Sequence, residues 1–233
     1  TLESAGTVTQ TAAGIIGATT LTLEGGGTFT LATANNAVTT LDADNAALGG
    51  TLRFRDDDGF AVAGITAGAN DVYLRSDGGT VTQGGVISCA TLFLQGAGGV
   101  FTLDTQLNTV TTLDADTNVL GTTRFRDDGG FAVAGITAGA NDVHLRSDGG
   151  TVTQTGAISA AGLDLQGAGG THALNTVNNA IATLAGNTGT VSIRDNTGFA
   201  IGTVGTTDGL TASASATLES AGTVTQTAAG IIG

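Results

Sequence analysis

Apolar and polar residues alternate over short stretches of the chain, and clusters of Gly, Asn and Asp separate the stretches. A period of two places successive side chains on opposite faces of an extended strand, one face inward and one in water. The clusters, such as GGG at 25–27 and SDGG at 76–79, tolerate positive φ and form tight turns. No segment sustains a helical spacing of apolar residues, so the pattern predicts an all-β protein. The alternating apolar pairs include Leu21 and Leu23, Phe29 and Leu31, Leu52 and Phe54, Phe60 and Val62, and Leu92 and Leu94.

The chain also repeats itself. Residues 1–17 recur without change as residues 217–233. Inside this long period lie related repeat units of roughly 72 residues, and repetition at a fixed period is typical of stacked-repeat architectures. The segment GFAVAGITAGANDV, for example, occupies 59–72 and again 130–143. We therefore divide the chain into repeat units 1–72, 73–143 and 144–216, followed by the start of a next repeat at 217–233.

Each repeat unit contains about nine apolar stretches in three groups, and each group would form one coil of roughly 19 to 31 residues. Stacking coils at ~4.8 Å pairs every strand with the strands above and below it. The sequence thus predicts one continuous parallel β-helix (β-solenoid) over 1–233, with about three coils per repeat unit. A two-layer β-sandwich is the alternative, although sandwiches rarely carry such a period. Aligning the repeat units predicts stacked columns: Leu2, Leu74, Leu145 and Leu218; Val8, Val81, Val152 and Val224; Phe60, Phe131 and Phe199; and Phe54, Phe125 and Ile193.

The composition of the chain argues against several classes of binding partner. Seven Lys plus Arg against twenty Asp plus Glu give a formal net charge of −13, so nucleic acid and anionic membrane surfaces are not expected as partners. No apolar run approaches the ~20 residues that span a bilayer, so we expect no membrane insertion. The 40% of apolar residues is too high for a disordered tail. Cys89 is the single cysteine, which excludes an intrachain disulfide.

Acidic clusters are candidate calcium ligands, because Ca²⁺ prefers carboxylate oxygen and Asp-x-Asp on a strand presents both carboxylates on one side. The nonapeptide GGxGxDxUx of calcium-binding β-rolls is absent, and the third repeat unit carries Ala185 and Asn187 at the positions of one pair. We interpret the clusters as solvated turns and predict no metal site and no cofactor, with calcium as the open alternative. The clusters are Asp42 with Asp44, Asp56 to Asp58, Asp114 with Asp116, and Asp127 with Asp128.

Arginines stand beside these acidic runs, as they would in a polysaccharide-degrading β-helix enzyme. They recur at equivalent positions of each repeat unit, whereas a catalytic constellation would occur once. We therefore predict Arg–Asp pairs on outward strand faces, of modest energy, and no catalytic residues. The arginines are Arg53, Arg55, Arg124, Arg126 and Arg194.

The remaining candidates are single residues and threonine ranks. His172 aligns with Phe29 and Phe101, so it should point inward as a core substitution, while His144 aligns with Tyr73 and should point outward without catalytic partners. Cys89 aligns with alanines and should be a small buried thiol. Thr-x-Thr pairs could bind ice on a flat face, but Ala61 with Ala63 and Ala132 with Ala134 interrupt one rank. The Thr-x-Thr pairs are Thr7/Thr9, Thr20/Thr22, Thr28/Thr30, Thr80/Thr82, Thr151/Thr153 and Thr223/Thr225.

The repeats TVTQTAAGIIG, LTLEGGGTFTLATANNAVTTL and GFAVAGITAGANDV resemble those of bacterial filamentous-haemagglutinin-type exoproteins, the giant surface adhesins of two-partner secretion. The resemblance covers nearly the whole chain. It implies a right-handed parallel β-helix, export through an outer-membrane secretion partner, and an extracellular location at the bacterial cell surface. The chain carries no Arg-Gly-Asp triplet and no basic heparin-binding stretch, so no binding residue is carried over from the family.

Two classes of function are expected from these observations. The favoured one is a structural segment of a cell-surface filament or adhesin shaft, without catalysis, whose partners are neighbouring copies of the repeat and cell surfaces or glycans. Because an open strand edge is adhesive, we expect the array to continue, either covalently or by end-to-end stacking. The alternative is a binding surface formed by the repeat itself, for glycan, calcium or ice, and a polysaccharide-degrading enzyme is a distant third.

Overall fold

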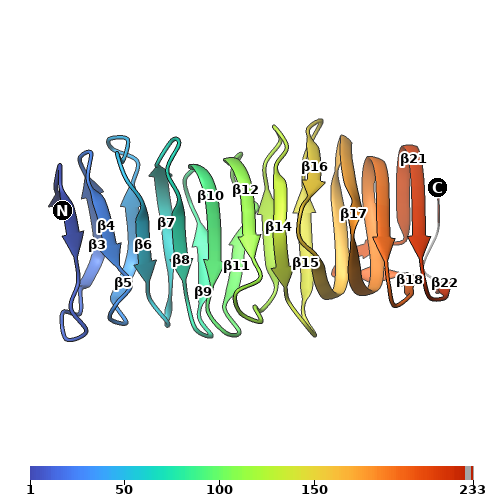
Figure 1. Ribbon diagram of the computed structural model, residues 1–233, viewed down its shortest axis with the longest axis horizontal. Helices are drawn as coiled ribbons and strands as arrows, with labels where there is room; N and C mark the ends of the chain where they lie inside the picture. Colours follow the sequence, from blue (N-terminus) through green and yellow to red (C-terminus); the bar gives the residue numbers. More distant parts are fainter. Residues whose placement is uncertain (229–231, 233) are drawn as a thin grey trace. The chain divides into compact units, whose positions relative to one another are not determined.

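The computed structural model describes residues 1–228 and 232, so the predicted repeat start at 217–233 lies partly outside the described residues. The chain folds as two compact parts, the N-terminal unit (Thr1–Gly121) and the C-terminal unit (Thr122–Gly233), and each is a stack of parallel β-coils (Figure 1). The described residues form strands and turns without a helix, and hence no helix that could cross a membrane. The predicted all-β parallel solenoid is confirmed.

In the N-terminal unit the strands alternate along the chain between two stacks. The stack that we call the even stack contains β2 (Thr7–Thr9), β4 (Thr28–Leu31), β6 (Leu52–Arg55), β8 (Val72–Arg75), β10 (Ile87–Gln95) and β12 (Thr109–Ala115). The odd stack contains β3 (Gly17–Glu24), β5 (Ala37–Ala43), β7 (Gly59–Thr66), β9 (Thr80–Gln83) and β11 (Val100–Leu103), and β1 (Leu2–Glu3) pairs with the end of β3. The start of β10 also pairs with the end of β7. All these pairings are parallel, so each strand hydrogen-bonds mainly within its own stack to the neighbouring coils.

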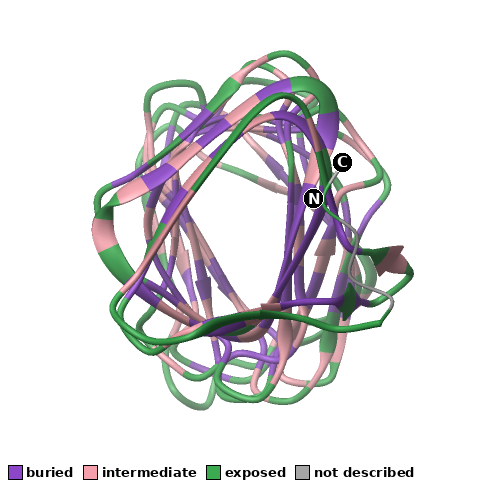
Figure 2. Cartoon of the chain, turned by 90° about the vertical axis from the view of Figure 1, so that its right-hand side faces the viewer, coloured by how far each residue is buried: buried purple, intermediate pink, exposed green. Residues whose placement is uncertain are grey.

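Alternation of side chains builds the core, as the sequence predicts. On β6 the apolar Leu52 and Phe54 are fully buried, while Arg53 and Arg55 face outward and are half-buried. Burial of one such side chain contributes ~1.5–3 kcal/mol. Looking along the coils, Figure 2 shows buried segments on the strands and exposed segments mainly at the turns. The interior of each coil is therefore the hydrophobic core.

The coils have a nearly constant length. Successive partners in the even stack lie roughly 20 residues apart, within the predicted range, and they are Val8, Phe29, Leu52, Val72, Leu92 and Leu113. From Phe29 on β4 to its counterpart Phe101 on β11 the chain changes stack seven times. A shift by one repeat unit therefore spans three and a half coils, where the sequence predicts about three.

The predicted columns are wrong because of the extra half coil, which places a residue and its counterpart in the next repeat unit in different stacks. Val8 pairs with Phe29 in the even stack, whereas Val81 pairs with Phe60 and Phe101 in the odd stack. The other aligned sets are not columns either. Leu2 pairs with Leu23, Leu74 with Phe54 and Leu94, Phe125 with Leu145, Val152 with His172, Ile193 with Leu218, and Phe199 with Val224.

The C-terminal unit repeats the two-stack arrangement around a long bent strand. Its strands are β13 (Thr123–Arg126), β14 (Ala132–Thr137), β15 (Asp142–Arg146), β16 (Thr151–Gln154), β17 (Ile158–Asp195), β18 (Phe199–Ile201), β21 (Leu210–Ser220) and β22 (Val224–Gln226). β17 pairs at its start with β14, β15 and β16 and at its end with β18 and β21, so it winds through successive coils. A short antiparallel hairpin, β19 (Thr203–Val204) with β20 (Thr207–Asp208), interrupts the coil.

Candidate functional site

The outward Arg and Asp side chains of the N-terminal unit form a ladder along the turns. Arg55 pairs with Asp57 of its own coil and lies 3.3 Å from Asp77 of the next coil. Arg75 pairs with Asp77 at 2.7 Å. Each aspartate also accepts a backbone N–H from the next coil, Asp57 from the Asp77 amide at 3.2 Å and Asp77 from the Ala97 amide at 2.9 Å. The hydrogen bonds to Arg55 hold the pKa of Asp57 below its usual range.

The C-terminal unit contains the same ladder. Arg126 contacts Asp128 and Asp148 at 2.8 and 2.9 Å, and Arg146 contacts Asp148 at 2.7 Å. The pKa of Asp128 is lowered, mainly by its hydrogen bonds to Arg126. The predicted outward Arg–Asp pairs are thus confirmed for Arg55 and Arg126, which link successive coils, whereas the predicted Arg53 lies over the Tyr73 ring. Arg194 pairs instead with Glu219, at 2.9 Å.

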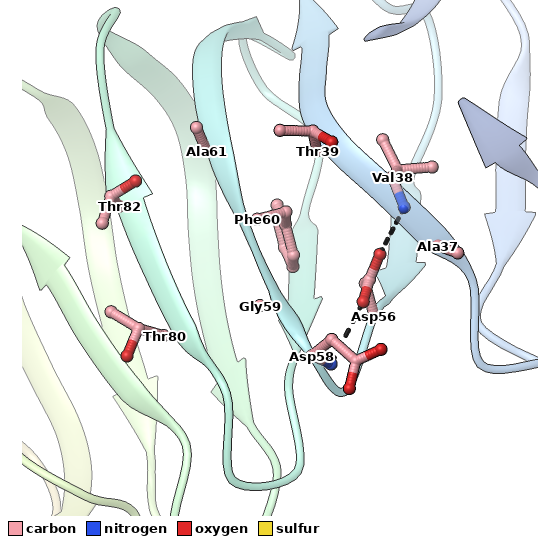
Figure 3. Close-up of a pocket in the computed structure, with 10 residues that line it drawn as sticks. All are labelled: Ala37, Val38, Thr39, Asp56, Asp58, Gly59, Phe60, Ala61, Thr80 and Thr82. Carbon is pink, nitrogen blue, oxygen red and sulfur yellow. Dashed lines mark hydrogen bonds between the residues drawn. The ribbon is translucent and has the colours of Figure 1, made fainter. Parts of the chain in front are cut away.

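A second set of acidic residues is buried at the turns and bonded to the backbone. The two carboxylate oxygens of Asp56 accept the amides of Val38 and Asp58 at 2.6 and 3.1 Å (Figure 3). Burial nevertheless raises the pKa of Asp56. Asp195 accepts the amides of Ile181 and Thr197 in the same way. These acids cap turns, and their oxygens are already used by the protein.

The Asp-x-Asp pairs lie on the outer side of the coil with both carboxyls close together, as predicted. Partial burial and the Asp42 carboxyl raise the pKa of Asp44, and burial together with the charge of Asp116 raises the pKa of Asp114. Within residues 1–228 and 232, no group of three or more His, Cys, Asp or Glu side chains is arranged to hold a metal ion. In that part of the chain, each pair therefore offers two carboxylates and no third such ligand.

Buried Asn–Gln pairs are a feature that the sequence analysis misses. Asn108 accepts the Ile87 amide at 2.9 Å, accepts a hydrogen bond from Gln83, and donates to the Leu103 carbonyl at 3.0 Å. Asn36 with Gln10 and Asn179 with Gln154 repeat the arrangement. The sequence does carry a signal for these pairs, because a polar residue recurs in each repeat unit at a position of the strand where an apolar residue is expected. These pairs tie neighbouring coils together through the core.

One outward column of the N-terminal unit is aromatic. Arg53, Tyr73 and Phe93 are partners on adjacent strands of the even stack. The Tyr73 and Phe93 rings are stacked at 4.1 Å and 3°, and the Arg53 guanidinium lies 3.4 Å from the centre of the Tyr73 ring. All three residues are half-buried. Both faces of the Tyr73 ring are therefore covered within the column, one by Arg53 and the other by Phe93.

The corresponding column of the C-terminal unit is polar and covered. Arg124, His144 and Asp164 are partners on adjacent strands, and the His144 Nδ1 lies 2.9 Å from the Asp164 carboxylate. Thr207 of the β19–β20 hairpin donates to Asp164 at 3.2 Å, and Gly205 lies against the His144 ring. His144 therefore points outward, as its alignment with Tyr73 predicts, but this hairpin, which residues 1–143 lack, folds over the outer face and leaves His144 only 6% exposed.

The other single residues lie where the sequence places them. His172 is fully buried in the core, where desolvation lowers its pKa to about 4. Its Nδ1 lies 3.3 Å from the Thr188 hydroxyl, and its Nε2 is buried without a hydrogen-bond partner among the described residues. Cys89 is a buried thiol that pairs with Val110 in register. Both side chains are thus enclosed in the core, where solvent hardly reaches them.

The outer faces are shallow. A hollow of about 520 Å³ lies on the odd stack where small residues leave space between the coils, and Figure 3 shows its lining. Gly59 and Ala61 form its floor, and Thr80 and Thr82 form one wall. The threonine rank through this face runs from Thr40 to Ala61 to Thr82, so Ala61 interrupts it as predicted.

Most polar clusters therefore recur along the stack and bond coil to coil, while the aromatic column and the hairpin-covered histidine occur once each in the described residues. Such recurrence favours a structural use of these groups over a chemical one. Compared with known proteins, the chain matches no protein-family model, no curated protein and no solved structure.

Proposed function

We propose that this chain is a structural segment of a bacterial cell-surface filament or adhesin shaft, similar to the repeat region of filamentous-haemagglutinin-type exoproteins, and that it performs no catalysis. The observation that carries the proposal is the repeated use of polar side chains as bonds between coils. Asp57 and Asp77, for example, each bond to their own coil and to the next one. A chain that uses its polar groups in this way gains length and stiffness along the stack.

Mechanically, such a segment adds length in proportion to sequence. Each coil of roughly 20 residues adds ~4.8 Å, so one copy of the segment 1–216 would add ~50 Å. The net charge of −13 keeps neighbouring shafts apart. The partners in this proposal are copies of the repeat along the shaft, an outer-membrane secretion partner, and cell surfaces reached by a recognition part elsewhere.

Electron microscopy tests the proposal. Arrays with one, two and three copies of the segment 1–216 would be displayed on cells, and their contour lengths measured after release from the surface. We expect each copy to add ~50 Å, and protease treatment of intact cells to remove the array. Length that does not scale with copy number, or an array protected inside the cell, would contradict the shaft function.

A repeat-borne glycan-binding surface is the second candidate, and the Arg53–Tyr73–Phe93 column favours it. This column is half-buried, whereas His144 of its counterpart in the C-terminal unit lies under a hairpin and is 6% exposed. The test is glycan-array binding of the double variant Tyr73→Thr/Phe93→Thr against Thr82→Ala, a control on the odd stack. Binding that is lost only in the double variant would support the second candidate, and equal binding by all forms would refute it.

A further inference from the structure

The Arg–Asp ladder of the C-terminal unit stops on an arginine. Within this ladder Arg126 contacts two carboxylates, Asp128 of its own coil at 2.8 Å and Asp148 of the next coil at 2.9 Å. Arg146 contacts Asp148 of its own coil, but Ala168 stands in the next coil where a second aspartate would be. Among the described residues Arg146 therefore has one carboxylate where Arg126 has two, and its side chain is 47% exposed against 21%.

A hollow of about 300 Å³ lies at this end of the ladder. Arg146 belongs to β15, and Gln166 and Asn187 belong to β17, so the hollow spans several turns of the chain. Small-molecule sites in proteins begin at about this volume. The lining consists of polar side chains and two small residues, and it contains no aromatic ring among the described residues. It is formed by Arg146, Asp148, Gln166, Gly167, Ala168 and Asn187.

Asp148 has an unused carboxylate oxygen at the hollow. The bonds that Arg126 and Arg146 donate to Asp148 all end on Oδ2, and no described residue donates to Oδ1. In the N-terminal unit the corresponding Asp77 uses both oxygens, because its Oδ1 accepts the Ala97 amide at 2.9 Å. The segment that follows the aspartate by one coil is the same in both units, QGAGG at 95–99 and at 166–170, so the sequence alone does not reveal this difference.

Gln166 and Asn187 supply two side-chain amides to the same hollow. The Gln166 Nε2 donates to the Asp164 carboxylate at 2.6 Å and to the Thr207 hydroxyl of the β19–β20 hairpin at 3.0 Å. These two bonds fix the orientation of the amide and leave its Oε1 as an acceptor without a donor among the described residues. Asn187 is exposed, and its amide bonds to no side chain or backbone group in the described part of the chain. The hollow thus presents one guanidinium beside several open acceptors.

We propose that this hollow binds an acidic sugar, a hexuronate whose carboxylate lies on Arg146 and whose hydroxyls lie on Asp148 and the two amides. The carboxylate would take on Arg146 the place that Asp148 takes on Arg126, where a charge-assisted hydrogen bond forms at 2.9 Å. A sugar also carries hydroxyls that can donate to the open Oδ1 of Asp148 and to the amide oxygens. The carboxylate of an acidic protein side chain would meet Arg146 alone and leave those acceptors unused.

The charge of the molecule limits the size of such a ligand. The net charge of −13 disfavours anions in general, so a binding site for one needs a local cation. Arg146 meets this need, because its single carboxylate partner Asp148 is itself shared with Arg126. A single uronate therefore fits this hollow better than a polyanionic chain. The inference goes beyond the proposed shaft function, and its failure would leave the contour-length test unaffected.

NMR titration of the full-length chain with D-glucuronate tests the site, with the amide signals of Gly167 and Gly169 as the local readout. Arg146→Gln removes the cation, and Ala168→Asp places at the hollow the aspartate that the ladder lacks. The matched controls in the N-terminal unit are Arg75→Gln and Ala97→Asp, because the 40% exposed Arg75 is likewise followed by an alanine in the next coil. D-Glucose, which lacks the carboxylate, and acetate, which lacks the ring, are the ligand controls.

We expect saturable binding of glucuronate, about tenfold or more weaker in Arg146→Gln and in Ala168→Asp, and changed by less than about twofold in the two controls. Both substituted side chains are exposed, and an unchanged thermal unfolding midpoint would show that each variant is folded. Unchanged affinity in either folded variant, an equal loss in the controls, or no saturation below roughly 50 mM would overturn the proposal. Glucose binding as tightly as glucuronate would overturn the assignment of the carboxylate to Arg146, and acetate binding as tightly would overturn the assignment of the ligand as a sugar.

Discussion

Replacing His172 by Phe tests the interior of the C-terminal unit through its pH dependence. The His172 side chain is fully buried, and its Nε2 finds no hydrogen-bond partner in the described part of the chain. Desolvation lowers its pKa from 6.5 to about 4. The unfolded chain therefore takes up a proton on this residue between pH 6.5 and pH 4 that the folded chain does not, and the free energy of unfolding falls as pH decreases through this window.

The size of the effect follows from the two pKa values. Their difference corresponds to ~3.4 kcal/mol once the pH is below both values, and about 2 kcal/mol of this is already lost at pH 5. Phe is the appropriate replacement, because Phe29 and Phe101 at the aligned positions are fully buried. The His172→Phe variant keeps the side chain apolar at every pH, so its stability should not contain this loss.

The assay is urea unfolding at pH 7, 6, 5 and 4, with the difference between the wild-type chain and His172→Phe taken at each pH. Groups that titrate in both proteins cancel in this difference. Thr188→Val is the control, since it removes the hydroxyl 3.3 Å from Nδ1 but keeps the histidine, and it should retain the wild-type pH dependence. Parallel curves for the wild type and His172→Phe, within ~0.5 kcal/mol from pH 7 to 4, would refute the description of His172 as a buried neutral residue.

Three further substitutions probe contacts between coils. Gly85→Ala would place a Cβ 1.6 Å from the Ala63 carbonyl oxygen and should destabilise the coil by ~3 kcal/mol or more, whereas Gly84→Ala, with its nearest contact at 3.7 Å, should cost less than ~1 kcal/mol in thermal unfolding. Asn108→Ala leaves the buried Ile87 amide and Leu103 carbonyl without this partner, so it should lower the free energy of unfolding in urea by ~2–4 kcal/mol. The control Asn45→Ala, at an exposed position, should lower it by ~0.5 kcal/mol or less. Equal losses in the two variants would contradict a role of Asn108 in the core. Asp57→Asn should cost ~0.5–1 kcal/mol at low salt, and the cost should shrink in about 1 M salt and below pH 4, because the lowered pKa of Asp57 contributes stability only while the carboxylate is ionised.

Local features of this protein could be predicted from sequence because they depend on neighbouring residues. The alternation of Leu52 and Phe54 with Arg53 and Arg55 fixes which side chains enter the core. The buried position of His172 follows from its alignment with phenylalanines. These inferences need only the period of a strand and the comparison of one repeat unit with another.

Features that depend on the length of a coil or on an insertion could not be predicted in this way. Val8 and Val81 align in sequence but lie in different stacks, because one repeat unit ends half a coil beyond a whole number of coils. His144 aligns with an outward residue and does face outward, yet the β19–β20 hairpin from a later coil buries it. The Asn108–Gln83 pair left a trace in the sequence, since polar residues recur where apolar ones are expected, but the bond joins residues 25 positions apart.

The half-coil offset also bears on how such a chain grows by gene duplication. A block as long as one repeat unit, copied in tandem, sends each of its strands to the other stack, as Leu41 on β5 and its duplicate Leu113 on β12 show. Every strand sequence must consequently be compatible with both sides of the coil, and a block selected on one side is displayed on the other in the next copy. Tandem copying of one block therefore places the same strand sequences on both sides of the coil. No second gene segment has to evolve to supply the other side.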